Sequence, residues 1–140
     1  MHYMESSIEA LGVYLHLAAA SHRRNQPLVR SRLLVLCGVM AYWLGLDGVA
    51  DHCRTLVLDQ NQSHLLGRFA DFDAALADDE FIALLRQLYR RYPREKAEQM
   101  LASLGIDPAG ERATYYTDLE YAASLLGVSP AQLTPPDEQS

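Results

Sequence analysis

Hydrophobic positions recur with helical spacing along almost the whole chain. Over residues 27–44 apolar residues return every three or four positions, and further apolar residues widen this stripe until it nearly encircles the helix. A helix of that kind is expected at the centre of the molecule, covered on several sides. No stretch alternates apolar and polar residues with the β-branched content typical of a strand. The pattern therefore predicts an all-α protein.

Prolines, glycines and capping residues mark where the helices begin and end. They indicate candidate helical segments over residues 5–21, 27–44, 47–59, 72–76, 79–91, 93–104, from 108 onward and 118–127, with a polar connector over 61–68. We expect six to seven helices in sequential antiparallel hairpins, forming either a compact bundle or a short array of hairpins. This single helical domain would span residues 1–133, followed by a disordered tail over residues 134–140.

Residues 104–109 and 126–131 are similar in sequence, each with a leucine, a glycine, an apolar residue, a capping residue and a proline. We interpret the similarity as shared helix-end chemistry. Gly105 and Gly127 are expected in the left-handed conformation that closes a helix. Asp47 is expected to cap the helix that follows it.

Residues 46–61, with the ending Leu56-Val57-Leu58-Asp59-Gln60-Asn61, resemble the second helix of a tetratricopeptide repeat. The likeness covers about residues 28–61, roughly a quarter of the chain. Gln60 stands where the family usually has proline, His52 takes a usual aromatic position, and no second copy is visible. The resemblance implies a helical hairpin that binds protein and brings no catalytic residue. If the chain is an array of hairpins, the resemblance implies that the array is tetratricopeptide-like.

Composition limits the classes of function. The 140 residues carry a formal net charge of −6, which argues against general affinity for nucleic acid or anionic membranes. The uncharged apolar run over residues 33–46 is shorter than the roughly 20 residues that span a bilayer, and no signal peptide is recognised. Cys37 and Cys53 lie in apolar helical patterns, so we expect buried, reduced thiols in a cytoplasmic protein. The strong preference for arginine over lysine is typical of a GC-rich bacterial genome.

The sharpest local feature is a basic-aromatic stretch over residues 86–96, which carries five basic residues and one acidic residue. Such a stretch could bind a phosphate backbone or an acidic protein surface. The alternative is a helix C-terminus whose solvated arginines interact with the helix dipole. The candidate partner- or anion-binding residues are Arg86, Tyr89, Arg90, Arg91, Tyr92, Arg94 and Lys96.

Motifs for catalysis or metal binding are missing from the sequence. No Glu-x-x-His or His-x-x-x-His pair occurs, although folding could bring His16 and His52 together. No nucleophile elbow or glycine-rich phosphate loop is visible. We therefore expect no cofactor and no metal, and the sequence favours a binding protein over an enzyme.

The leading hypothesis is a small helical protein-protein interaction module, an adaptor or assembly component that binds another protein or its own kind as a homo-oligomer. The first alternative is binding of an anionic ligand or nucleic acid through residues 86–96. A second alternative is an enzyme or metal protein without a recognisable motif.

Overall fold

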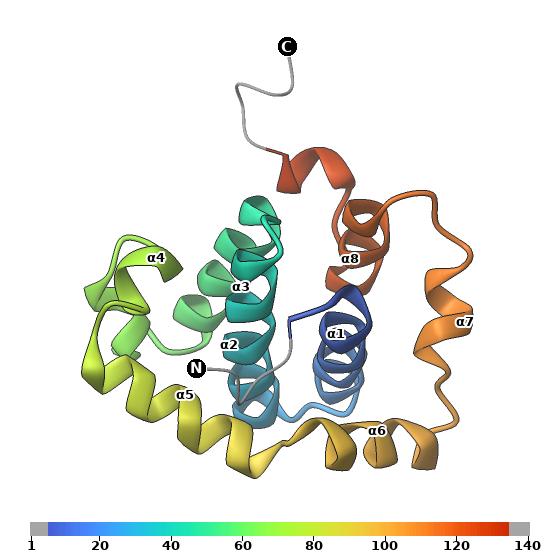
Figure 1. Cartoon of the computed structure of the whole chain (residues 1–140), viewed down its shortest axis with the longest axis horizontal. Coiled ribbons are helices and arrows are strands. Elements are labelled where there is room, and N and C mark those ends of the chain that lie inside the picture. The colour runs from blue at the N-terminus through green and yellow to red at the C-terminus, as the bar shows by residue number, and fades with distance from the viewer. Residues whose placement is uncertain (1–5, 135–140) are drawn as a thin grey trace.

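The computed structural model describes residues 6–134, and over that range the elements are all helical, which confirms the all-α prediction (Figure 1). Residues 6–134 form eight α-helices, more than the six to seven expected, and two of these are short, with four residues in α4 and five in α7. The elements are α1 (Ile8–Arg23), α2 (Pro27–Trp43), α3 (Asp47–Gln60), η1 (Leu65–Arg68), α4 (Phe72–Ala75), α5 (Asp79–Arg91), α6 (Arg94–Ser103), α7 (Pro108–Arg112), α8 (Asp118–Leu126) and η2 (Pro130–Leu133).

Helix α2 occupies the centre of the fold, as its broad apolar stripe predicts. It packs along both α1 and α3, and every residue over 33–41 is buried. Phe72 of α4 lies against the backbone of α2 at Gly38, where a Cβ would stand 2.3 Å from the ring. A larger residue at position 38 would push this ring out of the core, since cores are already close-packed.

The second half of the chain folds back over the first three helices. Helices α6, α7 and α8 all pack on α1, whereas α4 and α5 pack on α2. In Figure 1, α5 and α6 run along the lower edge of the molecule, below the ends of α1 and α2. Only α1, α2 and α3 therefore follow the expected series of sequential hairpins, and the later helices enclose that unit.

Helix ends follow a common pattern. Gly105 and Gly127 adopt positive φ angles of 72° and 73°, and the amide after each bonds back to a carbonyl in the last helical turn, as predicted. Gly45 ends α2 in the same way. The prediction for Asp47 is wrong: Leu46 is the N-cap of α3, and Asp47 is its first residue, where its charge still suits the helix dipole.

Most of the predicted C-terminal tail lies outside the described range. Residues 135–140 of the expected tail lie outside it, as do residues 1–5. Within residues 6–134, no helix is long and apolar enough to cross a membrane. One cluster of buried apolar side chains draws on elements from α1 to η2.

Candidate functional site

The junction of α5 and α6 divides the basic-aromatic stretch that the sequence singles out. Tyr92 is only 6% exposed, and its carbonyl accepts a hydrogen bond of 2.6 Å from the Tyr14 hydroxyl of α1. Its ring belongs to the core, so it cannot stack on a bound ligand as the sequence interpretation required. Tyr89 is half-buried on the same side, near Tyr14. The hydrogen bond between Tyr14 and Tyr92 thus ties the C-terminal end of α5 to α1.

Arg94 and Lys96 both form contacts within the chain. Arg94 is half-buried, and its Nε lies 3.5 Å from a carboxylate oxygen of Glu98 one turn along α6. The Lys96 ammonium donates a 3.1 Å hydrogen bond to the carbonyl of Arg91 and lies over the Tyr92 ring. A cation at the last carbonyls of a helix stabilises its C-terminus. Lys96 therefore has a local role in ending α5.

The three exposed arginines of α5 lie on different faces. Arg91 follows Leu84 by two helical turns, so the two side chains share a face. Arg86 and Arg90, one turn apart, share another face of α5. Of the seven predicted residues, only Arg91 lines a cavity shared with α2 and α3.

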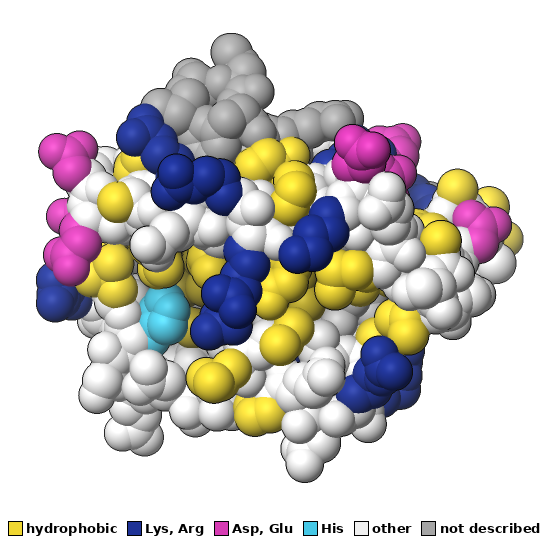
Figure 2. Space-filling model, turned by 90° about the horizontal axis from the view of Figure 1, so that it is seen from below, with side chains coloured by type: hydrophobic (Ala, Val, Ile, Leu, Met, Phe, Trp, Pro, Cys, Tyr) yellow, Lys and Arg dark blue, Asp and Glu magenta, His cyan; other side chains and the backbone are white. Residues whose placement is uncertain are grey.

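This cavity, which we call the basic hollow, lies between the N-terminal turns of α2, the C-terminal end of α3 and α5, with a volume of about 500 Å³. Figure 2 views this end of the molecule, with Lys and Arg side chains spread over it, hydrophobic side chains between them, and Asp and Glu side chains toward the margins. The lining residues are Leu28, Ser31, Arg32, Gln60, Asn61, His64, Leu84, Gln87, Leu88 and Arg91.

The lining combines two guanidinium groups with an apolar wall. It contains no Asp or Glu, and within residues 6–134 neither Arg32 nor Arg91 forms an ion pair. Leu28, Leu84 and Leu88 supply apolar surface, and Leu28 is 65% exposed. Planar guanidinium groups match carboxylates well, and apolar surface beside them favours a ligand that is not charged throughout.

His64 also lines the hollow. Its Nδ1 accepts a 3.0 Å hydrogen bond from the backbone amide of Leu66, an interaction that caps η1. The ring hydrogen of the neutral imidazole must therefore reside on Nε2, because only one ring nitrogen carries hydrogen in that state. Burial lowers the pKa of His64, which keeps the ring neutral at pH 7. Nε2–H is then the donor that the His64 ring retains.

Sequence reasoning missed Arg32 and His64, although a signal for the arginine existed. Residues 10–46 contain four arginines and no Asp or Glu. Two of them, Arg30 and Arg32, lie in the first turns of α2, whose N-terminal end borders the hollow. A count of charge by segment would have indicated this second basic stretch. For His64, no sequence pattern pointed to the hollow.

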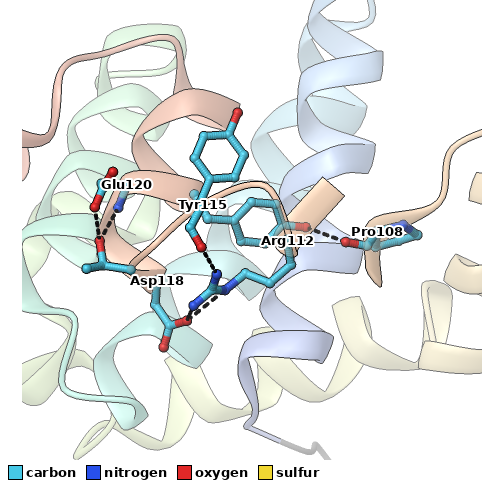
Figure 3. A network of polar contacts seen from close by, with 7 residues as sticks. Pro108, Arg112, Tyr115, Asp118 and Glu120 are labelled. Atoms are coloured by element: carbon cyan, nitrogen blue, oxygen red, sulfur yellow. Dashed lines mark hydrogen bonds and ion pairs between the residues drawn. The ribbon is translucent and has the colours of Figure 1, made fainter. Parts of the chain in front are cut away.

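A second site, around Arg112, differs from the hollow because its guanidinium group is paired with a carboxylate of the same chain (Figure 3). The Nε and Nη2 of Arg112 donate to one carboxylate oxygen of Asp118 at 2.9 and 2.7 Å. Its Nη1 donates to the Tyr115 carbonyl at 2.7 Å, and its guanidinium lies over the Tyr121 ring. This network joins α7 to α8, and we refer to it as the Arg112 network.

The two histidines considered as a metal pair have separate surroundings. His16 is buried on α1, with Nε2 3.0 Å from the Tyr121 hydroxyl, whereas His52 is half-buried on α3 beside η2. Among residues 6–134, no group of three or more His, Cys, Asp and Glu side chains is arranged to hold a metal ion. Cys37 and Cys53 are buried free thiols, and burial raises the pKa of both, that of Cys53 to about 12. Such thiols are poor nucleophiles.

Comparison of the chain with family models, with curated proteins and with solved structures finds no match in any of the three. The likeness of residues 28–61 to a tetratricopeptide hairpin accordingly gains no support from them. The chemistry of the basic hollow is therefore the basis on which a function is proposed.

Proposed function

We propose that this protein is a binding module whose basic hollow accepts an acidic, partly apolar segment of a partner protein. The observation that carries the proposal is the lining of the hollow. Arg32 and Arg91, which come from distant parts of the chain, meet there above a leucine wall with no acidic residue beside them. Two arginines without an ion pair at a concave surface add no stability to the folded chain. A role in binding therefore explains their position better than a role in stabilising the fold.

The shape of the lining favours a peptide over nucleic acid. Single-stranded nucleic acid binds by stacking bases on aromatic rings, and the hollow is lined by no Phe, Tyr or Trp. The net charge of −6 also opposes a long polyanion. A short segment with one or two carboxylates and a large apolar side chain uses the arginines, His64 and the leucine wall together.

Selection from a display library of random short peptides tests this proposal without a known partner. The wild-type chain is the bait, and a variant with Arg32→Gln and Arg91→Gln serves for counter-selection. A second variant, with Arg86→Gln and Arg90→Gln, loses the same charge from another face of α5 and is the matched control.

We expect the recovered peptides to be enriched in Asp or Glu next to Leu, Ile or Phe. They should bind the control variant as well as the wild type and lose about tenfold or more in affinity for the double variant in the hollow. Peptides that bind both variants equally would contradict the proposal. Binding of free phosphate or a small carboxylate with the same dependence on Arg32 and Arg91, without peptide enrichment, would favour a small anionic ligand instead.

A further inference from the structure

The end of α2 opposite the basic hollow carries the reverse charge. Tyr42, near the C-terminus of α2, donates a hydrogen bond to Asp73 of α4, and its pKa is raised by that bond and by the carboxylates of Asp71 and Asp47. Burial and the charges of Asp47 and Asp71 likewise raise the pKa of Asp51 on α3. Asp47 and Asp51 lie one turn apart on α3, Asp71 and Asp73 lie at the start of α4, and α4 packs on both α2 and α3, so the four carboxylates belong to one end of the fold. We call Asp47, Asp51, Asp71 and Asp73 the acidic end.

Each end of α2 also exposes a large apolar side chain. Leu28, in the first turn, is 65% exposed at the edge of the hollow. Trp43, the last residue, is 43% exposed and follows Tyr42, which donates a hydrogen bond to Asp73 of the acidic end. With 17 residues, α2 is about 25 Å long. The chain therefore presents a basic surface with exposed leucine and an acidic surface with exposed tryptophan at opposite ends of its central helix.

We infer that the partner of the basic hollow is a second copy of this chain, whose acidic end, a folded surface formed by α3 and α4, contacts the hollow. The inference rests on the proposed function, because it names the partner of the same hollow. Carboxylates of one copy would pair with Arg32 and Arg91 of the next, and Trp43 would cover the apolar wall. A large aromatic side chain beside charged groups is a common anchor of protein interfaces.

This contact joins unlike ends, so it produces a head-to-tail assembly. A two-fold symmetric dimer through either end would instead bring like charges together, which is unfavourable. In a head-to-tail contact each bound copy still offers one free hollow and one free acidic end, so the assembly grows with protein concentration. The net charge of −6 repels copies at long range, yet that repulsion is screened beyond about 8 Å at physiological salt.

Sedimentation equilibrium of the full chain over a range of concentrations tests the inference. The wild type should show an average mass that rises continuously with concentration and falls at high salt, since salt screens the contact between exposed charges. A basic-end variant, with Arg32→Gln and Arg91→Gln, and an acidic-end variant should each remain monomeric. The acidic-end variant carries Asp47→Asn, Asp51→Asn and Asp71→Asn, with asparagine at position 71 retaining the N-cap of α4.

Mixing the two variants gives the sharpest result. The intact acidic end of one variant fits the intact hollow of the other, so an equimolar mixture should reach the mass of a dimer and stop there. Two matched controls lose the same charges elsewhere and should associate like the wild type. They carry Arg86→Gln with Arg90→Gln, and Glu9→Gln with Asp79→Asn and Glu111→Gln. Circular dichroism verifies that every variant is folded.

Three results would overturn the inference: a wild type that stays monomeric at every concentration, a basic-end variant that associates like the wild type, or a mixture that shows no dimer. The wild-type measurement can overturn the inference by itself, even if one of the variants fails to fold. If the wild type is monomeric while the peptide selection still yields acidic sequences that need Arg32 and Arg91, the proposed function stands and the partner is another protein.

Discussion

The basic hollow and the Arg112 network both place arginine beside apolar side chains, but they satisfy the charge in opposite ways. Arg112 donates three hydrogen bonds to Asp118 and the Tyr115 carbonyl and covers the Tyr121 ring. Arg32 and Arg91 have no ion pair within residues 6–134 and face a cavity. The first arrangement stabilises the fold, and the second leaves donors for a ligand. The presence of arginine does not distinguish the two sites. The presence or absence of a partner for each guanidinium group within the described part of the chain does.

The largest expected difference between the two sites concerns the apolar side chain beside each arginine. Tyr121 is 1% exposed, so Tyr121→Ala should lower the free energy of unfolding by about 3–5 kcal/mol through the cavity it leaves. Leu28 is 65% exposed, so Leu28→Ala should change it by less than about 0.5 kcal/mol while weakening peptide binding. Urea denaturation followed by circular dichroism measures both.

Tyr121→Phe is the matched control for this comparison. It keeps the ring and removes only the hydroxyl that pairs with His16 Nε2, which should cost about 1–2 kcal/mol. If Leu28→Ala destabilised the chain as much as Tyr121→Ala, the wall of the hollow would be part of the core, and the comparison would fail.

The arginines themselves should show a smaller contrast. Arg112→Gln breaks the contacts between α7 and α8, and because Asp118 is partly exposed we expect a loss of about 1 kcal/mol in the free energy of unfolding. Arg91→Gln should leave that free energy within about 0.5 kcal/mol and reduce peptide affinity instead. The same denaturation and a binding titration measure both quantities. Equal stability losses for the two variants, or equal losses of affinity, would remove the distinction between the sites.

The smallest expected effect is a dependence of stability on pH. Burial lowers the pKa of His16, His52 and His64 in the folded chain, whereas the unfolded chain binds these protons at about pH 6.5. The unfolded state therefore holds more protons just below that pH, and the free energy of unfolding should fall as the pH drops from 6.5. It should level off once the folded-state pKa values are passed.

His64→Asn isolates the contribution of the hollow, because an asparagine oxygen can still accept the hydrogen bond from the Leu66 amide that caps η1. Denaturation midpoints between pH 7 and pH 5 should vary less for this variant than for the wild type. An unchanged pH dependence would mean that His64 is not held neutral by the fold.

Individual helices could be predicted well from the sequence where the spacing of apolar residues and a capping residue indicate the same boundaries. Residues 79–91 form a helix as expected, because Asp78 caps it and its apolar positions repeat without interruption. The ends at Gly105 and Gly127 follow from backbone chemistry that involves only nearby residues. Short η1, within the polar connector over residues 61–68, was missed, because its cap is a histidine ring nitrogen rather than a hydroxyl or carboxylate.

The site could be predicted only in part, because it depends on which helices meet. Residues 86–96 are recognisably basic in the sequence, but a helix boundary falls inside them and the Tyr92 ring is buried. Arg91 and Arg32 line the same hollow because α5 packs on α2. No local pattern encodes that contact, and segment-by-segment charge would have indicated only that two basic stretches exist.

Mapping a bound acidic peptide by amide chemical shifts tests the central claim most directly. A synthetic peptide of glutamate and leucine is titrated into the isotope-labelled wild type and into the Arg91→Gln variant. We expect shift changes to concentrate on amides of the basic hollow, including those near Arg32, Gln60 and Gln87, and to shrink strongly in the variant. Shift changes centred on the Arg112 network, or unchanged by Arg91→Gln, would contradict the claim.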